Sequence, residues 1–232
     1  MLFLIPLLCK AGRLFNTKNR GQFFFSKVLT FPTFRLIIDI VFSKGSLMIV
    51  MKKKVVLLGD SIRLGYGQLV PGMLGDAYEV WQSLDNCRFA KYTLRMLFEE
   101  AENIKGADVI HWNNGLWDAT ELFDDGTFST EEEYINNMVR IARLLKKITP
   151  NVIFATTTPV HPDFPTTHND KVDRFNEIIV PKLKEMGVVI NDVSALVKPH
   201  IDQYISSDLI HPNELGCEVC AKQVVSSIKQ FD

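Results

Sequence analysis

Short apolar runs alternate with longer amphipathic segments over most of the chain. The first run, V-V-L-L at 55–58, is too short for a helix and half β-branched, which is typical of a strand buried on both faces. Comparable segments predict four more strands, and between them apolar residues recur at helical spacing. The strands are expected at 55–58, 77–82, 108–112, 151–156 and 188–191. The helices are expected at 62–74, 89–101, 130–148, 170–186, 193–197 and 213–231.

Capping and breaking residues support several of these boundaries. Ser129 or Thr130, followed by three glutamates, predicts a helix start, because the first turn of a helix favours acids. Gly187 stands where a glycine in the left-handed conformation ends a helix. Three glycines and Pro71 within 62–74 predict an irregular helix there. The segments 116–129 and 198–212 read as a polar loop and an irregular stretch.

The expected order is a strand followed by a helix, five times over. This alternation predicts the α/β class, with one three-layer α/β/α sandwich around a parallel sheet of about five strands. Right-handed crossovers place helices on both faces of such a sheet. We expect residues 48–232 to form this single domain, which is long enough to bury a substantial core.

Residues 1–47 differ from the rest in composition. They contain Asp39 as their only acid, many phenylalanines and no clear periodicity. The apolar start at 1–8 has no basic region before it and no small-residue cleavage site after it, so it is a poor secretory signal. We interpret 1–47 as a doubtful extension from a start codon placed too far upstream, with translation beginning at Met48 or Met51. A genuine amphipathic anchor or leader is the alternative.

Charge and cysteine content narrow the classes of partner. A net charge of −1 gives no basic footprint for nucleic acid and no polybasic face for a membrane. Cys217 and Cys220 form C-x-x-C inside a helical pattern without a second cysteine pair, so no metal is expected. Reduced thiols and the lack of a convincing signal or transmembrane segment indicate a cytoplasmic protein. No cofactor is expected, and the oligomeric state is left open.

The residues Gly59, Asp60 and Ser61 follow the first expected strand directly. Parallel α/β sheets place ligands and nucleophiles at the carboxyl ends of their strands, so Ser61 is a candidate nucleophile. The alternative is that Ser61 only caps the helix that begins near Ile62. This tripeptide alone does not decide between the two roles.

A second reactive pair, Asp208 and His211, lies in the irregular stretch after the fifth strand. A serine hydroxyl needs a base at neutral pH, and histidine is the usual one. A carboxylate on the other ring nitrogen fixes the histidine tautomer and stabilises the imidazolium. The D-x-x-H spacing allows one turn to join Asp208 and His211 while His211 faces Ser61. Separately, such residues are more often caps or surface groups.

With these two motifs, the chain from about residue 53 to 231 resembles the SGNH (GDSL-type) hydrolase family. Gly59-Asp60-Ser61 matches the family's nucleophile block, and Asp208 to His211 (D-L-I-H) matches its last block. The resemblance implies a flavodoxin-like fold, with Ser61 as nucleophile, His211 as general base and Asp208 as its orienting acid. It also implies ester hydrolysis through an acyl-enzyme.

The middle blocks depart from the family pattern. In the second block Arg88 stands about where a glycine normally supplies an oxyanion-binding N–H. Its backbone can still donate, and its guanidinium can reach a carboxylate or sugar hydroxyl of the substrate, or lie on the surface. In the third block, Gly115 opens a G-L-W-D sequence in which Trp117 replaces the usual asparagine. Either Asn113 or Asn114 takes over as an oxyanion donor, or Asn114 serves only as a turn residue.

Two further features near strand ends have alternative interpretations. Trp81, Trp112 and Trp117 form either a wall that stacks on a sugar or, as is more common, part of the core. His111 lies inside the third expected strand and is expected in the core or just behind the site.

The sequence therefore predicts a serine esterase acting on a small ester, either a carbohydrate O-acetyl group or a short-chain acyl ester. The alternative is a weakly or non-catalytic protein that binds a glycan or acylated ligand in the same cleft, motivated by the altered third block. A flavodoxin-like nucleotide or flavin binder is disfavoured, because no glycine-rich phosphate loop follows the first strand.

Overall fold

The structure is a computed structural model that describes residues 23–30, 35–43 and 46–232. The chain divides into two compact units. One contains the described strands up to Lys53 together with Asp76–Glu79, and the other comprises Lys54–Gly75 and Val80–Asp232.

The first unit contains a three-stranded antiparallel sheet in the order β1-β2-β3. Its strands are β1 (Phe23–Thr30), β2 (Arg35–Ser43) and β3 (Ser46–Met51), with Ile40 of β2 paired to Phe25 and to Ile49. Met48 and Met51, the two expected translation starts, both lie in β3, and their assignment stays a prediction. The apolar start at 1–8 lies outside the described residues.

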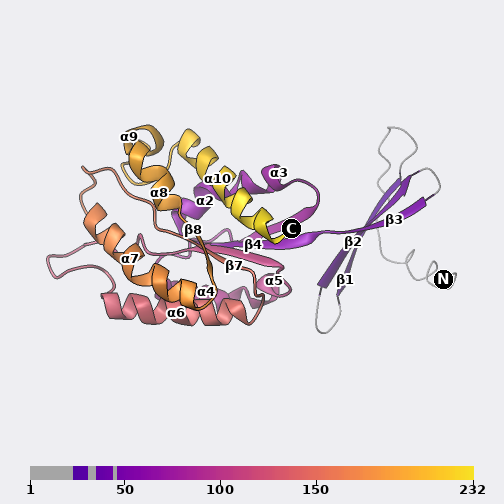
Figure 1. Ribbon diagram of the computed structural model, residues 1–232, viewed down its shortest axis with the longest axis horizontal. Coiled ribbons are helices and arrows are strands. Elements are labelled where there is room, and N and C mark those ends of the chain that lie inside the picture. Colours follow the sequence, from indigo (N-terminus) through magenta and orange to yellow (C-terminus); the bar gives the residue numbers. More distant parts are fainter. Residues whose placement is uncertain (1–22, 31–34, 44–45) are drawn as a thin grey trace. The chain divides into compact units, whose positions relative to one another are not determined.

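The second sheet has five strands in the order β5-β4-β6-β7-β8 (Figure 1). They are β4 (Lys53–Leu58), β5 (Tyr78–Gln82), β6 (Val109–Asn113), β7 (Val152–Ala155) and β8 (Val189–Asn191). The pairs β4–β6, β6–β7 and β7–β8 are parallel. This is the flavodoxin-like order, in which ligands bind outside the carboxyl ends of the strands where the chain reverses direction along the sheet.

Helices cover both faces of this sheet, which confirms the predicted three-layer α/β/α class (Figure 1). On one side lie α4 (Ala90–Glu99), α6 (Glu131–Lys146) and α7 (Asn169–Glu185). On the other lie α2 (Ser61–Gly67), α3 (Val70–Leu74), α8 (Val193–Val197) and α10 (Glu214–Ile228). Because both faces are covered, every residue of β6 and β7 is buried, and this explains the unbroken apolar run of β7.

Most predicted boundaries agree with the structure within a few residues. Thr130 caps α6 with a full capping box, and Gly187 follows α7 with a φ of +72°. The predicted helix at 62–74 divides into α2 and α3, because Pro71 sits in the first turn of a new helix. The helix predicted at 89–101 ends at Glu99 and is followed by α5 (Ala101–Ile104).

The stretch 198–212, predicted to be irregular, contains two short helical pieces. A 3₁₀ turn at Lys198–His200 leads into α9 (Ile201–Tyr204). Pro199 starts the first turn, and neither piece is long enough to show a helical apolar pattern. The predicted final helix ends at Ile228 and continues as a 3₁₀ turn at Lys229–Phe231.

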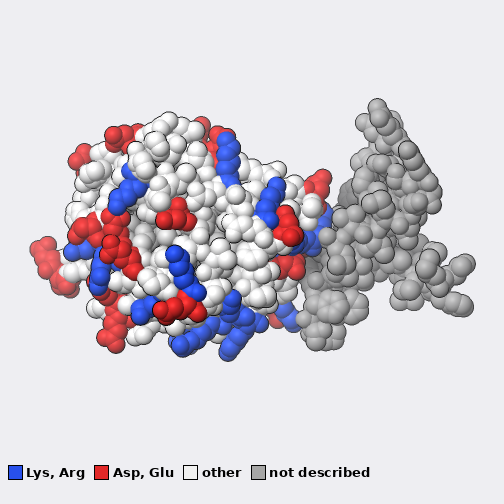
Figure 2. All heavy atoms as spheres, viewed as in Figure 1, with Lys and Arg blue, Asp and Glu red and all other residues white. Residues whose placement is uncertain are grey.

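The charged residues of the second unit are spread over its surface. Figure 2 shows basic and acidic side chains intermingled on the visible described face. Within the part of the chain that the structure describes, no helix is both long and apolar enough to cross a bilayer.

Candidate active site

Ser61 lies at the first position of α2, directly after the turn that follows β4. Gly59 has a φ of +153°, and a Cβ there would lie 1.9 Å from Oδ1 of Asn113, so only glycine fits this turn. Asp60 caps α2, with Oδ1 accepting from the Ile62 backbone N–H at 3.0 Å. The interpretation of Ser61 as the helix cap is therefore wrong, because Asp60 performs that function.

Ser61, His211 and Asp208 form one hydrogen-bonded row. The Ser61 hydroxyl lies 2.8 Å from His211 Nε2, and His211 Nδ1 lies 2.7 Å from Asp208 Oδ2. The three predicted residues thus come together although the serine precedes the histidine by 150 positions.

The carboxylate of Asp208 stabilises the turn that carries His211. Asp208 Oδ1 accepts hydrogen bonds from the backbone N–H groups of Ile210, at 3.0 Å, and His211, at 2.9 Å. It also accepts from the Ser206 hydroxyl at 2.7 Å. Leu209 adopts a φ of +71°, a left-handed conformation that tightens the turn at some cost in strain. The backbone thereby fixes both residues of the D-x-x-H motif.

These contacts determine the charge state of Asp208. Partial burial raises the pKa of its carboxyl, but the backbone N–H groups of His211 and Ile210, with the His211 ring and the Ser206 hydroxyl, outweigh burial. The pKa of Asp208 is therefore held well below its usual range. An ionised Asp208 accepts a hydrogen bond from Nδ1–H and so keeps the ring proton on Nδ1, which leaves Nε2 free to accept from Ser61.

A buried polar cluster lies behind the nucleophile turn. Asp60 and Asn113 are almost fully buried, and Asn113 Nδ2 donates to Asp60 Oδ1 at 2.8 Å. Asp60 Oδ2 and Asn113 Oδ1 have no hydrogen-bond partner. Burial raises the pKa of Asp60 to about 6, against the opposing hydrogen bonds from Asn113 and Ile62.

Sequence reasoning missed Arg63, which is fully buried one turn beyond Asp60. Its guanidinium donates to the backbone carbonyls of Ser83 and Asp85, each at 2.7 Å, and of Gly59 at 3.1 Å. Arg63 thus joins the nucleophile turn to the loop after β5. An arginine within the first turn of an otherwise apolar helix, as in G-D-S-I-R, was the available signal.

Arg88 occupies a glycine-like backbone position in the second block. Its φ is +48°, and its N–H donates to Asn86 Oδ1 at 2.7 Å. Its guanidinium lies 4.5 Å above the Tyr92 ring and 3.9 Å from Asp85, rather than at Ser61. The side chain therefore belongs to the surface, whereas the backbone keeps the shape that the family's glycine would have.

Asn114 braces this same loop. It is fully buried, and its Nδ2 donates to the Arg88 carbonyl at 2.9 Å while its Oδ1 accepts from the Thr93 hydroxyl at 2.9 Å. These bonds direct the amide to the Arg88 loop. Asn114 is therefore a positioning residue, different from the oxyanion donor that the sequence led us to consider.

In the third block, Trp117 lies at the site and Gly115 forms a tight backbone turn. Gly115 has a φ of +139°, and a Cβ there would lie 2.3 Å from Thr157 Oγ1. Trp117 is 40% exposed and lines a cavity together with Ser61. Asp118 is buried and accepts from the Ser129 hydroxyl at 2.6 Å, so it anchors the end of this loop.

Of the other residues singled out from the sequence, Trp112 and His111 belong to the core, whereas Trp81 is half-buried and lines a separate cavity. Trp112 is fully buried and packs against Phe154 at 4.9 Å, so the three tryptophans do not form a common wall. His111 is buried, contacts Asn191 through Nε2 at 3.0 Å, and has a pKa lowered by burial to about 3.

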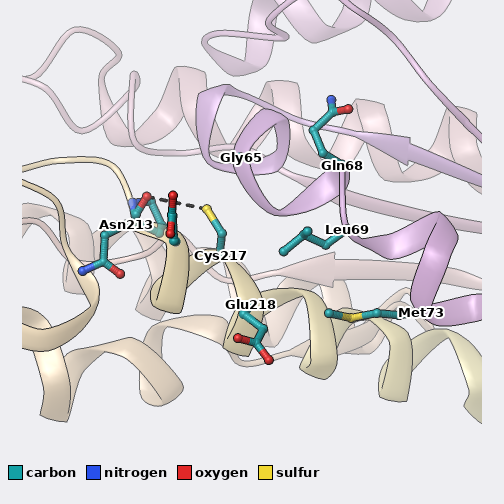
Figure 3. Close-up of a pocket in the computed structure, with 9 residues that line it drawn as sticks. Gly65, Gln68, Leu69, Met73, Asn213, Cys217 and Glu218 are labelled. Atoms are coloured by element: carbon teal, nitrogen blue, oxygen red, sulfur yellow. Dashed lines mark hydrogen bonds between the residues drawn. The ribbon is translucent and has the colours of Figure 1, made fainter.

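Two cavities flank the turn that carries His211. One, of about 250 Å³, is lined by Ser61, Leu116, Trp117, Thr120, Leu122, Phe128, Phe164, Thr166, Ile210 and His211. The other, a groove of about 670 Å³, lies between α2–α3 and α10, where Cys217 and Glu218 face Leu69 and Met73 (Figure 3). Of these two cavities, the smaller is the one lined by Ser61 and His211.

Solved hydrolase structures share this fold. A lipase/acylhydrolase from Enterococcus faecalis matches with a TM-score of 0.66 and 18% identity over 77% of this chain and 96% of that one. A GDSL-like lipase from Bacteroides thetaiotaomicron gives 0.62 and 19%, covering 77% and 88%. An acetylxylan esterase from Geobacillus stearothermophilus gives 0.62 and 17%, covering 76% and 94%. No family model and no curated protein matches the sequence.

The chain therefore has the α/β fold of the SGNH and GDSL-type hydrolases, as the sequence resemblance implied.

The buried carboxyl of Asp60 gives a pH-dependent stability prediction. Its pKa rises from 3.8 to about 6 on folding, so the folded state binds more protons than the unfolded state between these values. The unfolding free energy contributed by Asp60 therefore falls as pH rises from about 4 to 6. We expect Asp60→Asn, which keeps the accepting oxygen, to be more stable relative to wild type at pH 7 than at pH 4, by about 2 kcal/mol.

Urea denaturation of both proteins at the two pH values measures this difference. Titrations of other groups cancel between the two proteins. A stability difference that does not change with pH would show that Asp60 is ionised as easily in the folded chain as in the unfolded one.

The left-handed backbone of Arg88 gives a second stability prediction. A side chain in this conformation is less stable than glycine by about 1 kcal/mol. Arg88→Ala removes the contact with Tyr92 and keeps the strain, whereas Arg88→Gly removes both. We expect Arg88→Gly to unfold at a higher urea concentration than Arg88→Ala, and equal midpoints would mean that the turn is unstrained.

Proposed function

We propose that this protein is a serine ester hydrolase that acts through an acyl-enzyme on Ser61. The observation that carries the proposal is the row in which the Ser61 hydroxyl lies 2.8 Å from His211 and His211 lies 2.7 Å from Asp208. Such a row provides a nucleophile, a base and an orienting carboxylate in hydrogen-bond contact. The fold shared with solved lipases and esterases supports the same chemistry.

The reaction has two balanced steps. Ser61 Oγ attacks the ester carbonyl while His211 Nε2 takes the hydroxyl proton, and Asp208 stabilises the imidazolium. The tetrahedral intermediate collapses, the bond to the alcohol oxygen breaks, and His211 returns the proton to the leaving alcohol. Water then attacks the acyl-enzyme with His211 again as base, which releases the carboxylic acid and restores Ser61.

The negatively charged oxygen of the tetrahedral intermediate, the oxyanion, needs hydrogen-bond donors. We assign these donors to the second and third blocks. The backbone N–H of Arg88 lies on a glycine-like turn and donates to Asn86 Oδ1 at 2.7 Å, so serving the oxyanion requires it to exchange this bond for one to the substrate. The indole N–H of Trp117, at the cavity wall, is a further donor beside Ser61. Gly115 contributes through the tight turn that presents Trp117. Donors directed at the developing charge accelerate acyl transfer by about 10²-fold or more.

The proposed substrate is a small ester, either a carbohydrate O-acetyl group or a short-chain acyl ester. An acetylxylan esterase among the solved structures with this fold supports the first, and a lipase/acylhydrolase supports the second. The alternative of a ligand-binding protein without turnover needs no hydrogen-bonded base on Ser61, and the following experiment separates the two.

We expect a fluorophosphonate probe to label the wild-type protein covalently, and p-nitrophenyl acetate to be hydrolysed. Both reactions should disappear in Ser61→Ala, because the attacking oxygen is removed. His211→Ala should lower turnover by about 10³-fold or more, because Ser61 loses its base. Asp208→Asn should lower it to a similar extent, because the carboxylate that fixes the His211 tautomer is removed.

Circular dichroism of the three variants provides the control for folding. A wild-type protein that binds neither probe nor ester covalently would favour the binding protein. Full turnover in His211→Ala would refute the assigned base.

A further inference from the structure

We propose that the cavity beside Ser61 binds the acyl group of the substrate, and that this group is an apolar chain several methylenes longer than acetyl. This inference rests on the proposed function, because it assumes that Ser61 attacks an ester. It selects the acyl-ester class over the carbohydrate acetate class.

The walls of the cavity are apolar apart from the end that carries the chemistry. Ser61 and His211 lie at that end, and apart from the indole N–H of Trp117 the other polar groups among the lining side chains are the hydroxyls of Thr120 and Thr166. The Thr120 hydroxyl already bonds to the Leu116 carbonyl at 2.9 Å and lies 2.9 Å from the Thr167 hydroxyl. A sugar in this cavity would lose water and find few hydrogen-bond partners for its several hydroxyl groups, whereas an alkyl chain needs none.

The apolar wall extends onto the surface. Nine large hydrophobic side chains are exposed among residues 52–232, and four of them lie on the loop at 116–129, which forms one wall of the cavity. These four are Trp117, Leu122, Phe123 and Phe128. Phe128 is held in place by Phe89, with ring centroids 5.0 Å apart. Exposed apolar groups gathered at one place mark a site for an apolar ligand.

The size of the cavity fits a chain better than an acetyl group. Its volume of about 250 Å³ is that of several water molecules, at about 30 Å³ each. The single methyl group of an acetate would leave most of this space without contacts. A chain of several methylenes would fill it, with its carbonyl carbon at Ser61.

The larger groove does not compete for this role. Neither Ser61 nor His211 lines it, and two carboxylates, Glu214 and Glu218, border it. An acyl chain bound there would place no carbonyl on the nucleophile. Its residues therefore supply a matched control for substitutions in the cavity.

The experiment compares kcat/KM for the p-nitrophenyl esters acetate, butyrate and octanoate. Each buried methylene favours binding about fourfold, so we expect butyrate, with two more methylenes, to exceed acetate by about 15-fold and octanoate to exceed butyrate. Thr166→Phe introduces an aromatic ring into the cavity and should lower the octanoate-to-acetate ratio at least about tenfold. Gln68→Phe introduces the same ring beside the larger groove and should leave the ratio at its wild-type value.

The outcomes separate the two proposals. Acetate turnover that depends on Ser61, with octanoate no better than acetate, would overturn the acyl-chain proposal and leave the hydrolase intact. A ratio lowered by Gln68→Phe and not by Thr166→Phe would overturn it as well. No turnover of any ester and no fluorophosphonate labelling would overturn both. If Thr166→Phe fails to fold, the kcat/KM values of the wild-type protein for the three esters still test the acyl-chain proposal.

Discussion

The hydrogen bond between Ser61 and His211 is the contact on which the rest of the site depends. It joins two turns 150 residues apart, and each turn is fixed by its own short-range bonds. The Ser61 turn needs the absence of a side chain at Gly59 and the cap of Asp60. The His211 turn needs the Asp208 carboxylate, which bonds two backbone N–H groups as well as the ring. The parallel sheet brings the two turns to the same edge.

This placement is obtained at some cost to stability. Asp60 and Asn113 each leave one buried oxygen without a partner, and Arg63 leaves one buried nitrogen. Arg88 and Leu209 adopt left-handed conformations that suit glycine better. Strain and unpaired polar groups concentrated around a nucleophile are typical of functional sites, where surrounding structure holds them in place. Here the buried guanidinium of Arg63 joins the turns through three backbone carbonyls.

The sequence predicted the strands, the long helices and the three residues of the row, because these depend on apolar periodicity and on short motifs. It did not predict how Arg63 and Asn114 brace the loops, since those bonds connect side chains to backbone carbonyls far along the chain. The segment 116–129 was predicted to be a polar loop, yet it supplies the apolar wall of the cavity. Its hydrophobic residues follow neither a helical nor a strand period, so only the folded loop gathers them.

Mapping the acyl group on the protein during turnover tests the central claim most directly. The protein would be mixed with p-nitrophenyl acetate, quenched in acid within the first turnovers, digested and analysed by peptide mass spectrometry. We predict an acetyl ester on the peptide that contains Ser61, and on its hydroxyl. Acetylation of another residue in its place, or steady turnover with Ser61 always unmodified, would contradict the account.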